Sequence, residues 1–263
     1  MIAPIVDTHV HIFDRHTPLL ESKWNPNGEE APIDALMAVF AAHGVQRGVL
    51  STSSIYGLNN EYFRQALARF PQLRATTNLP LDIGRASLAQ LDRAGFVGIR
   101  LLWRPLADVP DLRSAEWQAL LRLCADFGWH VHLTDRAERI GTTIGLLEAA
   151  GTRVVIDHMG MIDSADGIDD PGFVAILEAI ERGRTWVKLG GAFRYSNPRR
   201  AEACGRAVIA AGGWERVMWG SDWPFVGHMG KVRYEDTMDC LGWAIDPAMR
   251  QRIESETASR FYF

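Results

Sequence analysis

The chain has 263 residues, of which 47% are hydrophobic, and its formal net charge is -4 at pH 7. This length is sufficient to bury one large core, and the weak negative charge gives no reason to expect nucleic acid or an anionic membrane surface as a partner. The three cysteines, Cys124, Cys204 and Cys240, are far apart and in no CxxC arrangement, which argues against a disulfide framework and favours reduced thiols.

The N-terminal stretch MIAPIVDTHVHIFD has Asp and His where a signal peptide needs an uninterrupted apolar run. No apolar stretch of about 18 residues, the length of a membrane-spanning helix, follows it. We therefore predict a cytoplasmic protein that has no membrane partner.

Eight short β-rich runs alternate with amphipathic segments along the chain. The runs cover residues 5–10, 47–53, 73–79, 97–103, 130–135, 153–160, 186–191 and 216–224. Helical periodicity, several times closed by Gly, predicts helices over 33–44, 60–71, 87–95, 115–128 and 137–151. No low-complexity linker separates these segments, so we predict one domain over residues 1–263.

Eight strand–helix units in about 250 residues are typical of an α/β fold of the (β/α)8 TIM barrel type. A doubly wound open sheet is the alternative. That alternative is weakened because none of the expected strands is followed by a glycine-rich phosphate loop.

Titratable residues recur at the ends of three expected strands. His9 and His11 in VDTHVH lie two residues apart, so they share one face of a strand. His158 follows the apolar run of VVIDHMG, and Asp222 follows that of VMWGSDWPF. Because the carboxyl ends of barrel strands meet at one mouth, we expect these four residues to line one pocket and to be catalytic.

The motifs VDTHVH, DHMG and WGSDWP, in this order and at these separations, resemble the amidohydrolase superfamily. Within it they are most similar to the branch of sugar-acid, muconate-type and pyrone-dicarboxylate lactonases, and the resemblance runs from Asp7 to Pro224. It implies a distorted (β/α)8 barrel in which Asp222 is the general base on water. It also implies that His9, His11 and His158 surround the carbonyl group under attack.

Metal-dependent members of the superfamily bind one or two divalent ions. A two-metal site needs a Lys or Glu at the end of the fourth expected strand, where this chain reads GIRLLWRP, and we interpret Lys188 in WVKLGG as a buried, paired lysine. We therefore predict that no metal is required. The alternative is one Zn²⁺ or Mn²⁺ held by His9, His11, His158 and Asp222, since imidazoles and a carboxylate are ordinary metal ligands.

Arginines supply a second signal. Arg100 in GIRLLWRP and Arg194 in GGAFRY fall where the resembled pyrone-dicarboxylate lactonases bind substrate carboxylates, and a guanidinium suits a carboxylate or sulfonate through paired hydrogen bonds. Arg104 is a candidate for a further charge, and His132 or Thr134 in HVHLTD is placed to reach the pocket. We predict that these five residues bind a small substrate that carries at least one anionic group.

Taken together, these residues predict a hydrolase of the carboxylic ester type that opens a small anionic lactone: a muconolactone, a pyrone carboxylate or a sugar-acid lactone. Two alternatives stay open. One is a mononuclear zinc-dependent hydrolase or decarboxylase of a small carboxylic acid, and the other is a catalytically silent barrel that only binds a ligand. The sequence leaves the particular lactone and the oligomeric state open.

Overall fold

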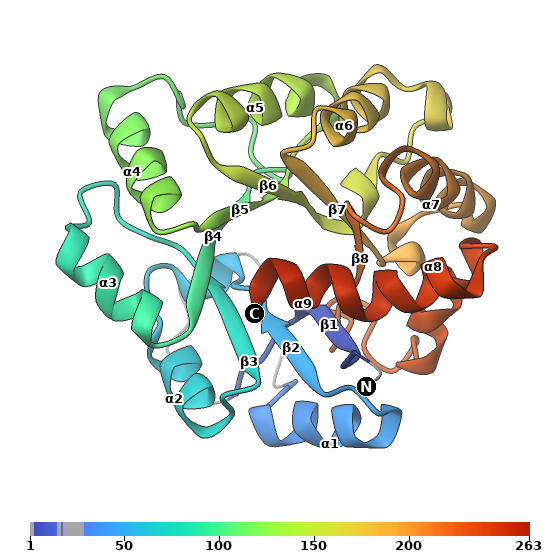
Figure 1. The fold of residues 1–263 in the computed structure, drawn as a ribbon, viewed down its shortest axis with the longest axis horizontal. Coiled ribbons are helices and arrows are strands. Elements are labelled where there is room, and N and C mark those ends of the chain that lie inside the picture. Colours follow the sequence, from blue (N-terminus) through green and yellow to red (C-terminus); the bar gives the residue numbers. More distant parts are fainter. Residues whose placement is uncertain (1–2, 15–16, 18–28) are drawn as a thin grey trace.

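The computed structural model describes residues 3–14, 17 and 29–263, which form a single ring of eight parallel strands in the order of the sequence (Figure 1). The strands are β1 (Val6–Val10), β2 (Arg47–Leu50), β3 (Leu73–Thr77), β4 (Phe96–Leu102), β5 (His130–Thr134), β6 (Arg153–Ile156), β7 (Thr185–Leu189) and β8 (Val217–Trp219). This is the predicted (β/α)8 barrel, and the doubly wound alternative is wrong because the strands follow one another around a ring.

Helices surround the ring in Figure 1, except that the last of them crosses one mouth of the barrel. They are α1 (Ile33–His43), α2 (Glu61–Arg69), α3 (Arg85–Arg93), α4 (Ala115–Asp126), α5 (Ala137–Ala149), α6 (Pro171–Glu181), α7 (Pro198–Gly212), α8 (Pro247–Gln251) and α9 (Thr257–Tyr262). Shorter 3-10 turns are η1 (Ser54–Tyr56), η2 (Asp157–Met161), η3 (Gly167–Asp169), η4 (Ala192–Arg194) and η5 (Glu235–Trp243), and one π turn is η6 (Arg252–Glu256). Among the described residues, no helix is long and apolar enough to cross a membrane.

Local chemistry explains several helix starts. The Ser114 side chain accepts a hydrogen bond from the backbone N–H of Trp117 and so caps α4. At α6, Asp170 caps the first turn and Pro171 occupies the position where a missing N–H costs nothing. The five helices expected from the sequence lie within two residues of their predicted ends.

The C-terminal helix α9 closes one mouth of the barrel (Figure 1). Its Ala258, Phe261 and Tyr262 pack against Val6 of β1 and Val155 of β6. These contacts lie at the amino-terminal side of the strands, so the open mouth is the one at which the strands end. That is the side where this architecture carries its active sites.

The barrel is closed between β1 and the segment after β8. The backbone N–H of Asp222 donates to the carbonyl of His9 at 2.8 Å, and the N–H of His11 donates to the carbonyl of Trp223 at 2.8 Å. The Thr8 hydroxyl donates to the carbonyl of Trp219 at 2.6 Å. Closure of the barrel thus places the histidines of β1 and the following residues beside Asp222 at the open mouth.

Several of the expected strands end earlier than predicted, and the difference is largest for two of them. The stretch 153–160 divides into β6 and the turn η2, and the stretch 216–224 is a strand only over β8. The cause is a backbone reversal at the barrel mouth: φ is 52° at His158 and 69° at Asp222. Such left-handed values end a strand and turn the following side chain.

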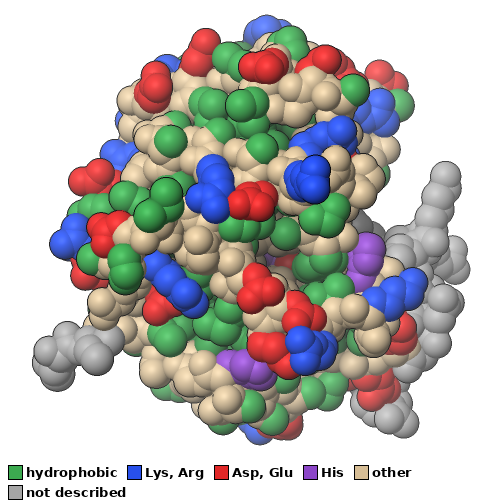
Figure 2. Space-filling model, turned by 90° about the vertical axis from the view of Figure 1, so that its right-hand side faces the viewer, with side chains coloured by type: hydrophobic (Ala, Val, Ile, Leu, Met, Phe, Trp, Pro, Cys, Tyr) green, Lys and Arg blue, Asp and Glu red, His purple; other side chains and the backbone are tan. Residues whose placement is uncertain are grey.

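The surface carries mixed charge. On the face shown in Figure 2, acidic and basic side chains are interspersed among apolar ones. This distribution agrees with a net charge of only -4.

Candidate active site

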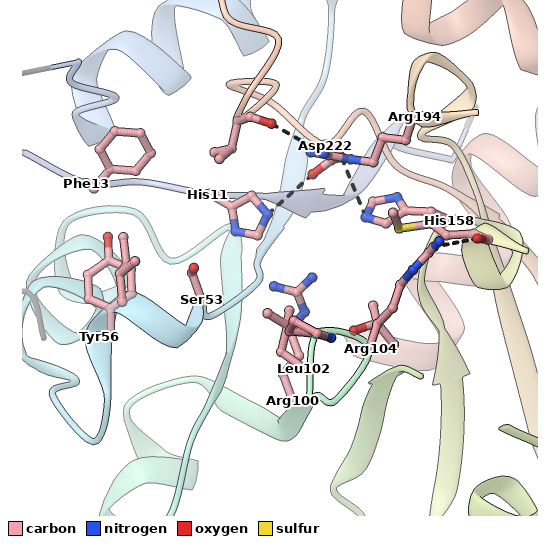
Figure 3. A pocket seen from close by; sticks show the side chains of 15 residues that line it. His11, Phe13, Ser53, Tyr56, Arg100, Leu102, Arg104, His158, Arg194 and Asp222 are labelled. Carbon is pink, nitrogen blue, oxygen red and sulfur yellow. Dashed lines mark hydrogen bonds and ion pairs between the residues drawn. The ribbon is translucent and has the colours of Figure 1, made fainter. Parts of the chain in front are cut away.

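A cavity of about 380 Å³ opens at the carboxyl ends of the strands (Figure 3). Seven of the nine predicted site residues line it: His11, Arg100, Arg104, Thr134, His158, Arg194 and Asp222. Apolar side chains such as Ile55, Leu102 and Val226 complete the wall. A pocket of this size with a few convergent polar groups has the form of a small-molecule site.

Asp222 is the carboxylate of this cavity. Its Oδ2 accepts a hydrogen bond from Nε of Arg194 and lies 3.6 Å from Nε2 of His158, whereas its buried Oδ1 has no hydrogen-bond partner among the described residues. Burial alone would raise the pKa of Asp222, but His158 and Arg194 outweigh it and hold that pKa well below its ordinary value. Asp222 is therefore an ionised acceptor with one oxygen free.

The two histidines on the cavity wall are neutral. Burial lowers the pKa of His158 to about 4, and burial also lowers the pKa of His11. Nδ1 of His11 donates to the carbonyl of Ser51 at 2.7 Å, and its Nε2 lies 3.3 Å from Oδ1 of Asp222. Both rings point towards Asp222 in Figure 3.

His9 does not line the cavity as predicted; it lies directly beneath it. Its Nε2 is 3.2 Å from Nε2 of His11, and its Nδ1 is 3.0 Å from Nζ of Lys188. Burial and the nearby Lys188 keep the pKa of His9 well below its ordinary value. The position follows from the strand: His9 is still inside β1, whereas His11 follows it.

Beneath the cavity lies a second group of buried charges that the sequence only partly indicated. Lys188 on β7 is fully buried, and its Nζ lies 3.2 Å from Oδ1 of Asp157. Nε of Arg100 donates to Oδ2 of the same Asp157 at 2.9 Å. Lys188 is thus buried and paired as predicted, but Asp157 was missed, although its place beside His158 in DHMG could have marked it.

The prediction that His132 contacts substrate is corrected by its position. Its Nδ1 is 3.1 Å from Nζ of Lys188, and its Nε2 is 3.0 Å from Oη of Tyr262 on α9. Both ring nitrogens are therefore taken, and the ring is fully buried below the mouth. Two residues further along β5, Thr134 does reach the cavity.

Three guanidinium groups converge on the cavity and keep donors free. Nη1 of Arg100 donates to the carbonyl of Thr52 at 2.6 Å, and Nη1 of Arg104 donates to the carbonyl of Met161. Arg194 donates through Nε to Asp222. In the described part of the chain Nη2 of each arginine has no partner, so each can donate to an anion in the cavity.

Three of these side chains form a group that could hold a metal ion. One ligand atom from each of His9, His158 and Asp222 lies within 4.8 Å of the others. The unpartnered Oδ1 of Asp222 is a suitable ligand atom. The other neighbours are less suitable, because Arg194 already binds Oδ2 and Lys188 contacts His9.

Comparison with known proteins extends over the whole chain. The family model described as amidohydrolase matches residues 6–263. The 4-sulfomuconolactone hydrolase of Hydrogenophaga intermedia is 27% identical, over 97% of this chain and 88% of its own.

Two solved structures share the fold closely. A protein of Pseudomonas putida assigned as a 2-pyrone-4,6-dicarboxylic acid hydrolase has a TM-score of 0.90 and 34% identity, covering 100% of this chain and 98% of its own. A protein of Acinetobacter baumannii with the same assignment, solved with citric acid bound, has a TM-score of 0.92 and 26% identity, covering 100% of this chain and 99% of its own.

Proposed function

The chain belongs to the amidohydrolase family and is a hydrolase, and from that premise we propose that it opens the ring of a small anionic lactone. The observation that carries the proposal is the ionised Asp222, which lines a cavity into which three arginines direct unused donors and whose buried Oδ1 has no hydrogen-bond partner among the described residues. The lactone and pyrone hydrolases among its relatives support the same substrate class.

The proposed reaction needs a positioned water, a base and donors for the developing oxyanion. Oδ1 of Asp222 takes a proton from water while the water oxygen bonds to the lactone carbonyl carbon. The bond from that carbon to the ring oxygen then breaks, and the proton passes to the ring oxygen, leaving a hydroxy acid. General-base assistance of this kind supplies a rate factor of about 10² to 10⁴.

Oxyanion stabilisation falls to donors on the cavity wall. Neutral His158 has one N–H to offer, and Arg194 retains a free Nη2 on the same side of the cavity as Asp222 (Figure 3). Losing one such preorganised donor typically lowers kcat by about 10² to 10³.

The substrate's own charge is recognised by arginine. Arg104 and Arg100 reach the cavity from the side opposite Asp222 and Arg194 (Figure 3). An anionic group can therefore bind to them while the carbonyl lies near Asp222. This separation supports a carboxylate or sulfonate attached to the lactone rather than an uncharged sugar ring.

We infer that a metal is not needed, because the buried group already holds more positive than negative charge. Lys188, Arg100 and Arg194 pair with two carboxylates, Asp157 and Asp222. A divalent ion would add two positive charges to a buried group that already has one in excess, and buried charge without a partner is costly. The grouping of His9, His158 and Asp222 is what supports the mononuclear zinc alternative. The charges of the residues present nevertheless fit a metal-free reaction better.

The test is a panel of anionic and neutral lactones with pH-indicator detection of the acid released, applied to the wild type and to Asp222→Asn. Asn tolerates the left-handed backbone of position 222, so the variant should fold. We expect kcat to fall by about 10² to 10⁴ with KM nearly unchanged, because the base is lost and the arginines remain.

Exhaustive chelation of the wild type separates the two mechanisms. We expect kcat to stay nearly unchanged. Loss of activity that Zn²⁺ or Mn²⁺ restores would establish the mononuclear alternative instead, and failure to hydrolyse any lactone in the panel would overturn the proposed function.

A further inference from the structure

A row of hydrogen-bonding groups runs from the buried Lys188 through two histidines to the backbone. Nζ of Lys188 lies 3.0 Å from Nδ1 of His9, Nε2 of His9 lies 3.2 Å from Nε2 of His11, and Nδ1 of His11 lies 2.7 Å from the carbonyl oxygen of Ser51. The two ends of this row differ chemically. An ammonium group can only donate, and a carbonyl oxygen can only accept.

The donor end determines the proton position on His9. Because the Lys188 ammonium donates to Nδ1, that nitrogen carries no proton, and the proton of the neutral ring is on Nε2. Oδ1 of Asp157 also lies 3.2 Å from Nδ1 of His9, but it lies equally 3.2 Å from Nζ of Lys188, and the ammonium group has enough protons to serve both acceptors. A proton on Nδ1 would moreover face the ammonium group at 3.0 Å.

The acceptor end determines the proton position on His11. Its Nδ1 must donate to the carbonyl of Ser51, so the neutral ring has no proton on Nε2. That nitrogen can then accept from the protonated Nε2 of His9. Both ends require the same direction of donation along the row, and no step places two donors face to face.

The consequence reaches the cavity. Nε2 of His11, without a proton, lies 3.3 Å from Oδ1 of Asp222, which also has no donor. Two adjacent acceptors repel each other unless a molecule with two donors lies against both. Water is such a molecule, and His11 and Asp222 both line the cavity that would admit it.

We propose that Lys188 is a positioning residue that sets the proton positions of His9 and His11, so that Nε2 of His11 and Oδ1 of Asp222 together hold the attacking water. The inference rests on the proposed lactone hydrolysis. It changes the roles predicted for two histidines: His11 orients the water as an acceptor, and His9 transmits the orientation from below. The donors left for the oxyanion are His158 and the arginines.

The direct test is ¹⁵N NMR of the wild type labelled in histidine, at neutral pH, with His9→Gln and His11→Gln used only for assignment. We expect a protonated Nε2 and an unprotonated Nδ1 for His9, and the reverse for His11. A proton on Nε2 of His11 or on Nδ1 of His9 would overturn the proposal. Because this measurement needs no substrate, it stays informative if lactone hydrolysis itself is not found.

Lys188→Met tests the role in catalysis, with Tyr262→Phe as the control. Tyr262 contacts Lys188 only through His132, on the arm that leads away from His9. In Lys188→Met we expect the histidine proton pattern to be lost and kcat to fall about 10- to 100-fold at nearly constant KM, as when the partner of an active-site histidine is removed. Tyr262→Phe should keep the pattern and kcat.

Folded Lys188→Met with the wild-type proton pattern and kcat would refute the role of the ammonium group. If this variant does not fold, the wild-type spectrum decides the proposal. If the proton pattern is found and no lactone is hydrolysed, the positions of the protons stand and the proposed function falls.

Discussion

At the barrel mouth, two catalytic candidates depend on backbone conformations that few side chains adopt. His158 and Asp222 both have positive φ, at the ends of β6 and β8. Left-handed residues other than glycine cost energy and are concentrated at functional sites. Here the conformation turns both side chains toward the same cavity, where their nearest polar atoms are 3.6 Å apart.

Arg104 is the arginine best suited to test anion binding, because its side chain hydrogen-bonds a backbone carbonyl, whereas Arg100 and Arg194 each bind a carboxylate. Nη1 of Arg104 donates to the carbonyl of Met161. We expect Arg104→Met to raise KM for an anionic lactone about 10- to 100-fold, since a hydrogen bond to a charged group contributes about 1.5 to 3 kcal/mol. Steady-state kinetics would check this, with kcat changing little.

Arg113→Met is the matched control, because Arg113 is exposed and its nearest partner, Asp111, lies 3.8 Å away. It should leave KM unchanged. If Arg104→Met had no effect on KM, or raised it equally for a neutral lactone, Arg104 would not be the anion site.

At the scale of elements, the close approach of the ends of β7 and β8 holds Arg194 and Asp222 side by side. Gly190 follows β7, and a Cβ atom there would lie 2.0 Å from the backbone oxygen of Gly220 after β8. Gly190→Ala must therefore separate the two strand ends that carry Arg194 and Asp222. We expect it to lower the free energy of unfolding by about 1 to 3 kcal/mol, as overpacking does, and to lower kcat as well.

Gly145→Ala on α5 provides the comparison, because a Cβ atom there meets nothing within 4 Å. This change should raise stability by about 0.5 to 1 kcal/mol and leave kcat alone. Urea unfolding of both variants measures the difference. Equal free energies of unfolding for the two alanine variants would show that the close approach of Gly190 to Gly220 does not matter for stability.

At the scale of the whole molecule, the buried histidines make stability depend on pH. Burial lowers the pKa of His158 to about 4, and it also lowers the pKa values of His9, His11, His130 and His132. Above about pH 6.5 neither the folded nor the unfolded chain protonates these rings, whereas below it only the unfolded chain does. The free energy of unfolding should therefore fall as the pH falls from 6.5 towards 4.

His158 alone accounts for a loss of at most about 3 kcal/mol over this range, since one pKa unit corresponds to 1.36 kcal/mol. Asp7 acts in the opposite direction: burial raises its pKa to about 6, so the folded chain binds its proton more readily. Burial also raises the pKa of Glu254, so two carboxyl groups act against five buried histidines. Urea unfolding at a series of pH values measures the net effect of these groups on the free energy of unfolding. A free energy of unfolding that stays constant or rises on acidification would contradict the prediction.

We also propose that residues 1–263 form one domain, as the sequence predicts. The backbone hydrogen bonds from β1 to the segment after β8 join the two ends of the ring. A ring closed in this way should unfold as a unit. Calorimetry should therefore show one transition, and two separable transitions would refute a single domain.

The sequence by itself determined the barrel, the mouth that carries the site, and most residues around the cavity. Alternating strand and helix signals depend on local periodicity, which any segment expresses without knowledge of its neighbours. The paired histidines and Asp222 were recognisable because each is a polar residue at or near the end of an apolar run, whereas Arg100 and Arg194 were predicted from the resemblance to the lactonase branch.

Only the tertiary structure decided which of these residues reach the cavity and which lie beneath it. The depth of His9 and His132 depends on strand register and on where α9 closes the opposite mouth. The contacts among His9, Asp157 and Lys188 join residues up to 179 positions apart, so no local pattern could reveal them. The hydrogen bonds among these side chains exist only because the closed barrel brings distant strands together. The chemical role of each residue therefore follows from the tertiary structure.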